Sequence, residues 1–81
     1  NAVKPQDNSI ILARLASEDI NIFSAHKEGD DLVIEYEYGW HPDAYKTKWT
    51  KAIYIIEYPA SLPEALEHIL REVTNIRNEL N

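Results

Sequence analysis

The clearest pattern in the chain is an alternation of apolar and polar residues between positions 32 and 38. One face of this run is apolar and consists of Leu32, Ile34, Tyr36 and Tyr38. The other face carries Glu35 and Glu37 beside Val33. A period of two residues with one apolar face is typical of a half-buried antiparallel strand. The pattern therefore predicts a strand over residues 32–38 with one side in the core.

Two further strand-like runs flank this one. Residues 20–25 alternate in the same way, and the short segment 27–30 that follows contains Gly29, which accepts the positive φ of a tight hairpin turn. Residues 51–58 are rich in β-branched and aromatic side chains, which favour strands. Both faces of this third run are apolar, so we expect it to be a central or well-covered strand.

The C-terminal part predicts a long amphipathic helix. Ser61 and Glu64 match a capping box, with Ser61 as N-cap and Glu64 three residues later. The apolar residues that follow recur every three or four positions: Leu62, Leu66, Ile69, Val73, Ile76 and Leu80. Such a stripe is expected to lie across the sheet. Packing of this helix against a second copy of itself is the alternative.

A shorter helix is predicted over residues 9–17. Ile11, Leu12 and Leu15 recur at helical spacing, and Asp7, Asn8 or Ser9 are candidate N-caps. The apolar run 10–12 is also compatible with the start of a strand. Residues 1–8 are polar and contain a proline, so we expect an extended segment there. We interpret residues 1–2 as a remnant of a tag or of processing.

Together these elements predict one α+β domain over residues 9–81, in the order helix, three strands, helix. The expected sheet is three-stranded, mainly antiparallel, and packed against the long C-terminal helix and the shorter N-terminal helix. So small a sheet has two edges and a face that the helices need not cover. Homodimerisation through an edge or a helix is therefore a further prediction.

Composition limits the function classes. The 81 residues include 14 acidic and 8 basic side chains, for a net charge of −6. Nucleic-acid affinity depends on concentrated Lys and Arg, so this balance disfavours nucleic acid as a partner. The chain has no cysteine, which excludes disulfides, thiolate catalysis and cysteine-ligated zinc. No apolar run approaches the roughly 20 residues of a membrane span, and no secretory signal is visible, so we expect a cytoplasmic location and no membrane partner.

No arrangement of residues predicts catalysis, a cofactor or a metal site. Glu64 and Glu72 lie four residues on either side of His68 and are the best candidate metal ligands, but we interpret this ladder as polar groups facing water. His26 and His41 are interpreted in the same way. No serine occurs in a strained Gly-x-Ser-x-Gly setting, so we predict that the protein is not an enzyme.

The segment 39–51 is the best candidate for a binding site. It holds both tryptophans and three of the eight basic residues, and it interrupts two strand-like runs, so we expect a loop or the end of a hairpin. The predicted partner-binding residues are Trp40, His41, Tyr45, Lys46, Lys48, Trp49 and Lys51. Aromatic residues rimmed by lysines are typical of protein-interaction hot spots, so we predict a protein-interaction or regulatory module.

Other interpretations of this segment remain. One or both tryptophans can fold back onto the core, and we expect this of Trp49 more than of Trp40. Glu35 and Glu37 are expected to pair across strands with Lys46, Lys48 or Lys51. The acidic polar side of the C-terminal helix is interpreted as a solvated face, with a basic partner as the alternative.

The alternative function is a nucleic-acid-binding module that uses the same lysines and aromatic residues. The order helix, three strands, helix resembles that of double-stranded-RNA-binding domains in topology only. The resemblance implies lysines at the start of the second helix. Here residues 61–68 contain Glu64 and Glu67 and no lysine, so the expected phosphate contacts are missing.

Overall fold

The computed structural model describes residues 8–57 and 60–80. Its elements run α1 (Ser9–Ser17), β1 (Ile20–Glu28), β2 (Asp31–Asp43), β3 (Lys46–Glu57) and α2 (Leu62–Leu80). This is an α+β fold in the predicted α-β-β-β-α order. Apart from Asn8, the predicted extended segment 1–8 lies outside the described residues, as does Tyr58 at the predicted end of the third strand.

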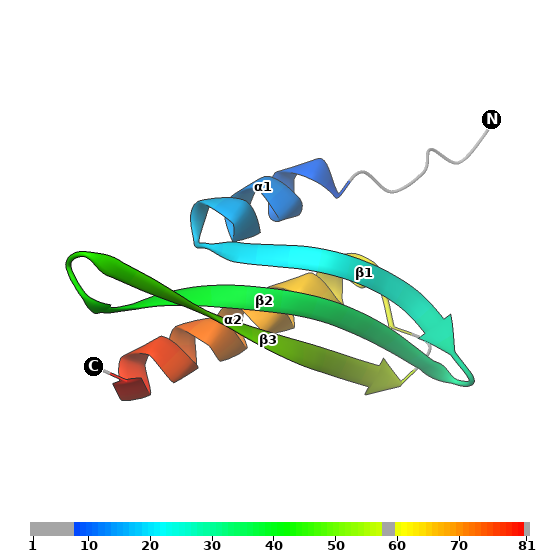
Figure 1. The fold of residues 1–81 in the computed structure, drawn as a ribbon. Coiled ribbons are helices and arrows are strands. Elements are labelled where there is room, and N and C mark those ends of the chain that lie inside the picture. Colours follow the sequence, from blue (N-terminus) through cyan, green and yellow to red (C-terminus); the bar gives the residue numbers. More distant parts are fainter. Residues whose placement is uncertain (1–7, 58–59, 81) are drawn as a thin grey trace.

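The three strands form one antiparallel sheet in the order β1-β2-β3 (Figure 1). Glycine at position 29 has a φ of 60°, which permits the tight turn between β1 and β2. A register shift between Ile22 and Ser24 places Phe23 in a β-bulge on the edge strand β1. Because β2 pairs with both neighbours, β1 and β3 are both edges.

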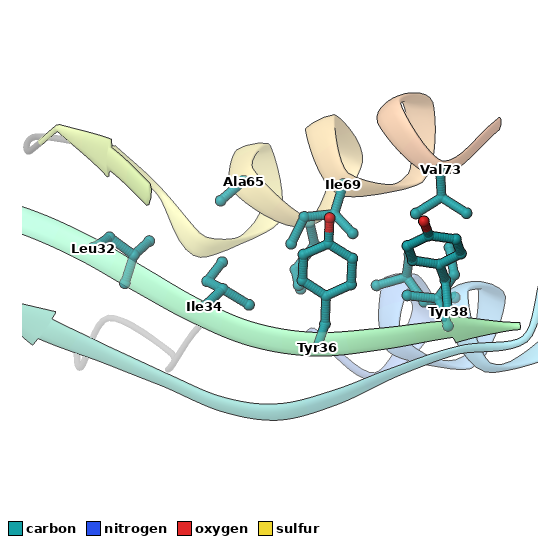
Figure 2. Packing of buried hydrophobic residues seen from close by; sticks show 10 residues of the cluster. Leu32, Ile34, Tyr36, Tyr38, Ala65, Ile69 and Val73 are labelled. Atoms are coloured by element: carbon teal, nitrogen blue, oxygen red, sulfur yellow. The ribbon is translucent and has the colours of Figure 1, made fainter. Parts of the chain in front are cut away.

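The core lies between the sheet and the two helices. In Figure 2 the predicted apolar face of β2 points at α2, with Tyr36 and Tyr38 close to Ile69 and Val73. The buried residues of the core are Leu15, Ile20, Leu32, Ile34, Tyr36, Tyr38, Ala65, Leu66, Ile69 and Val73. The core thus contains residues from α1, β1, β2 and α2.

Both helix starts can be compared with prediction. The backbone N–H of Glu64 donates to Oγ of Ser61 over 3.3 Å, so Ser61 caps α2 as expected. Asn8 occupies the N-cap position of α1 but makes no side-chain capping hydrogen bond. At the other end of α1, Asp19 adopts a left-handed φ of 58°, which lets the chain reverse into β1.

The strands are longer than predicted, and the position of β3 in the sheet differs from the prediction. The sequence predicted that β3 is central or well covered, and this is wrong: β3 is an edge strand, and its residues Ile53 and Ile55 are exposed. The reason is that both helices lie on the same side of the sheet, since Leu15 of α1 shares one core with α2. One apolar side of β3 faces that core and the other has no helix over it.

We call the side of the sheet away from the helices the open face. Strand alternation assigns to it the following residues: Asn21, Phe23, Ser24, His26 and Glu28 of β1; Asp31, Val33, Glu35, Glu37 and Gly39 of β2; and Trp49, Lys51, Ile53, Ile55 and Glu57 of β3.

Candidate functional site

The aromatic and basic segment 39–51 forms most of a long β-hairpin. Strand β2 continues to Asp43 and β3 begins at Lys46, so only Ala44 and Tyr45 form the turn. Oδ1 of Asp43 accepts a hydrogen bond of 2.8 Å from the backbone N–H of Tyr45, an Asx-type contact that fixes the turn. The Tyr45 side chain is 96% exposed at the tip. Of the two predicted forms, a loop or a hairpin end, the structure has the hairpin.

The two tryptophans lie on opposite sides of this hairpin. Trp40 continues the helix-facing side of β2 and packs against the core. With His41, Arg77 and Leu80 it lines a small hollow of about 120 Å³ beside the end of α2. The expectation that Trp49 folds back onto the core more readily than Trp40 is therefore wrong. The reason is that the apolar alternation of β2 continues two residues beyond Tyr38. Trp40 therefore lies on the same side of the strand as Tyr38.

Trp49 lies on the open face, directly opposite Gly39 in β2. Its ring covers the glycine so closely that a Cβ atom at position 39 would lie 3.3 Å from two ring atoms. The indole remains 47% exposed. Because Gly39 has no side chain, the Trp49 ring can pack directly against the backbone of β2.

The three lysines of the segment are also divided. Nζ of Lys48 lies 5.7 Å from the centre of the Trp40 ring, whereas Nζ of Lys51 lies 5.9 Å from the centre of the Phe23 ring on the open face. Lys46 lies opposite Asp43 beside the turn. Two of the lysines therefore make cation–π contacts on opposite sides of the sheet.

The predicted lysine–glutamate pairs do not form. Within residues 8–57 no ion pair joins Glu35 or Glu37 to a lysine. Instead Oε2 of Glu35 accepts from the Ser24 hydroxyl, and Oε2 of Glu37 accepts from the Asn21 amide, each over 3.0 Å. Both carboxylates are held toward β1, on the side away from β3.

His41 connects the hairpin to the turn after α1. Its Nδ1 lies 3.1 Å from the Thr47 hydroxyl, and its Nε2 lies 3.5 Å from Oδ2 of Asp19. These contacts give the imidazole a structural role at the base of the hairpin.

The open face exposes several large apolar side chains. Phe23, Trp49, Ile53 and Ile55 are between 47% and 61% exposed, although all four are large apolar side chains. A shallow hollow of about 530 Å³ lies in the middle of this face. It is lined by Phe23, Glu35, Tyr36, Lys51, Ala52 and Ile53.

A second, polar hollow lies between β3 and α2. The phenol oxygen of Tyr54 and Nδ1 of His68 are 2.8 Å apart in a hydrogen bond, and Arg71, Glu72 and Asn75 complete the lining. The prediction that His68 faces water is wrong, because the half-buried imidazole packs against Tyr54. Burial, and then the negative charges of Glu72 and Glu64, raise the pKa of Tyr54, so the phenol keeps its proton.

The structure offers no assembled metal ligands in the part of the chain it describes: no three His, Asp or Glu side chains of residues 8–57 and 60–80 converge. His68 bonds to Tyr54, and the predicted ladder with Glu64 and Glu72 does not close around a common point. Neither described helix is at once long and apolar enough to cross a bilayer.

Comparisons of the chain with protein-family models, with curated proteins and with solved structures gave no match. The functional argument therefore rests on the surfaces described above.

The predicted binding segment and the open face overlap only in part. Trp49 and Lys51 belong to the open face, whereas Trp40, Lys48 and Tyr45 lie elsewhere on the hairpin. Phe23, Ile53 and Ile55 were not predicted as site residues. The sequence contained a signal for this surface. A strand with two apolar faces needs cover on both sides, whereas the predicted C-terminal helix has a single apolar stripe and can cover only one of them.

Proposed function

We propose that the protein is a non-catalytic protein-interaction module that binds a protein partner through the open face and the adjoining hairpin. The observation that carries the proposal is the set of four large apolar side chains on the side of the sheet that has no helix over it: Phe23, Trp49, Ile53 and Ile55. Large apolar side chains in contact with water are costly, and exposed apolar patches mark sites of association.

The hairpin supports the same surface. Trp49 packs against Gly39 and remains about half exposed. Tryptophan is among the residues that contribute most to binding when a partner covers them. Lys51 over Phe23 adds a cation beside the aromatic ring. Both rings are positioned before any partner arrives, which lowers the entropic cost of binding.

A nucleic-acid partner is less well supported by this geometry. Lys48 and Lys51 lie on opposite sides of the sheet and do not line one groove, while Glu35 and Glu37 lie in the middle of the open face. A backbone of phosphates would meet these carboxylates.

The test uses a pair of matched variants. Ile53→Gln replaces an apolar side chain on the open face by a neutral polar one. Ile10→Gln makes the same change on α1, where the side chain is 83% exposed. Both variants are immobilised beside the wild-type chain and exposed to an extract of the cells that make the protein.

We expect at least one protein to be retained by the wild-type chain and by Ile10→Gln and to be lost with Ile53→Gln. A circular dichroism melt of each variant checks that it is folded. If the retained proteins are the same for all three chains, the open face is not a docking surface and the proposal fails.

A further inference from the structure

The charges on the open face indicate which kind of partner fits it. Among the described residues, this face carries five carboxylates and one lysine. The carboxylates are Glu28, Asp31, Glu35, Glu37 and Glu57, and the lysine is Lys51. The apolar patch is therefore embedded in an acidic surface, although the hairpin that adjoins it is basic.

Three of the carboxylates form what we call the acidic row: Glu28, Asp31 and Glu57. Asp31 is the register partner of both Glu28 in β1 and Glu57 in β3. Carboxylates placed directly opposite one another across strands repel, so the row costs stability in the isolated protein. Within the row, Oε2 of Glu28 lies 3.0 Å from Nε2 of His26. Cations from a partner would relieve this repulsion.

The glutamates at the centre are held in position. Glu35 and Glu37 each accept a hydrogen bond from β1, from Ser24 and from Asn21, which fixes where their charges lie. Glu35 lines the hollow of about 530 Å³ together with Phe23, Lys51 and Ile53. Glu37 is the register partner of Lys51. An apolar side chain entering the hollow would therefore have carboxylates beside it, at positions suited to a flanking lysine or arginine.

Along β1, its shortest strand, the open face is about as long as α2. Strand β1 has 9 residues and helix α2 has 19. At about 3.3 Å per strand residue and about 1.5 Å per helix residue, both are roughly 30 Å long. A helix of the length of α2 would span the open face along β1, and it would complete a layer of helices on each side of the sheet.

We infer that the open face binds a cationic amphipathic helix of the partner, with its apolar stripe on Phe23, Ile53 and Ile55 and its lysines or arginines over Glu35, Glu37 and the acidic row. A second copy of this chain fits less well, because stacking two open faces brings five carboxylates against five. This inference rests on the proposed function, since it names the class of partner for the same surface.

The test uses defined peptides. The first probe is an 18-residue peptide of leucine and lysine, with leucines at helical spacing along one side. The second has glutamate in place of every lysine. Each is titrated into the isotopically labelled 81-residue chain, and backbone amide and tryptophan indole signals are followed by NMR.

We expect the lysine peptide to bind at least tenfold more tightly than the glutamate peptide and to weaken as salt is raised. The shifted signals should belong to the strands and to the Trp49 indole, while those of α2 stay in place. Equal binding of the two peptides, or shifts centred on α2, would overturn the inference.

Charge variants give the matched control. Asp31→Asn with Glu57→Gln removes two charges from the acidic row, and Glu67→Gln with Glu79→Gln removes two from the exposed side of α2. We expect the first pair to weaken the lysine peptide by about fivefold and the second to change it by less than twofold. An equal effect of both pairs would mean that only net charge matters, and it would also overturn the inference.

Failure here is distinguishable from failure of the proposed function. If Ile53→Gln abolishes capture of a cellular partner but the lysine peptide does not bind, the face is a docking surface for another kind of partner. Signals of the open face that shift with protein concentration alone, and cease to do so in Ile53→Gln, would identify the occupant as a second copy and exclude the cationic helix.

Discussion

Arg77, in the last turn of α2, donates two hydrogen bonds to the backbone carbonyl of Gly39 in β2, from Nε over 3.0 Å and from Nη2 over 2.7 Å. Nη2 also donates to the carbonyl oxygens of Glu18 and Asp19 in the turn after α1. The Gly39 N–H in turn donates to the Asp19 carbonyl over 2.9 Å. One guanidinium therefore joins both helices to the central strand at the base of the hairpin.

Replacing Arg77 should lower stability even when the positive charge is kept. Lysine cannot reproduce the planar fork that reaches these carbonyls, so we expect Arg77→Lys to lose about 1–2 kcal/mol and Arg77→Ala about 2–3 kcal/mol of unfolding free energy. Urea denaturation followed by circular dichroism measures both. Arg71→Lys, at an exposed position of the same helix beside the polar hollow, is the control and should stay within about 0.5 kcal/mol. An Arg77→Lys variant as stable as the control would contradict the role of the fork.

Two isoleucines on adjacent strands differ in burial, because one lies in the core and the other on the open face. Ile34 of β2 is 0% exposed and Ile55 of β3 is 60% exposed. We expect Ile34→Ala to cost about 2–5 kcal/mol, because it removes buried methylenes and leaves a cavity, and Ile55→Ala to cost less than about 1 kcal/mol. Chemical denaturation of both variants at low protein concentration provides the comparison. A similar cost for both would mean that Ile55 is buried in solution.

The sequence predicted the fold well because its elements have strong local signals. The alternation at 32–38 identified the core face of β2, and the apolar stripe after Ser61 identified α2 and its contact side. Strand ends were less predictable. The pairing of β2 with β3 continues past Trp40 to Asp43 and Lys46, where no apolar alternation on the strand requires it.

The candidate site was predicted only in part, because the exposure of a sheet residue depends on whether a helix packs over it. The apolar pattern of β3 is the same whether its second side is buried or bare. Deciding between these requires knowing that α1 packs beside α2, through Leu15, and not on the opposite side of the sheet. Sequence spacing within a short helix does not contain that information.

The contact between Tyr54 and His68 should contribute to the attachment of α2 to β3. The two side chains share a hydrogen bond of 2.8 Å and an edge-to-face ring contact with centroids 6.2 Å apart. In a double-mutant cycle with Tyr54→Phe and His68→Ala, we expect a coupling free energy of about 0.5–1.5 kcal/mol. Unfolding free energies of the wild type, both single variants and the double variant give this value. Strictly additive effects would show that the hydrogen bond contributes nothing measurable.

Tyr36 should make the protein sensitive to alkali. Its burial, and then the negative charge of Glu72, raise its pKa to about 12 from an ordinary value of 10.0. Below about pH 10 the phenol is neutral in both the folded and the unfolded chain, so the stabilisation is fully present. Between about pH 10 and 12 the unfolded chain loses the proton first, and stability falls as pH rises through this range.

Denaturant midpoints of three chains at several pH values between about 9 and 12 measure this effect. Tyr36→Phe removes the ionisable group, so its midpoint should decline less steeply with pH than that of the wild type. Tyr45→Phe is the matched control, because the Tyr45 side chain is 96% exposed and its removal should leave the wild-type slope unchanged. If Tyr36→Phe and the wild type decline in parallel, another group causes the alkaline loss of stability.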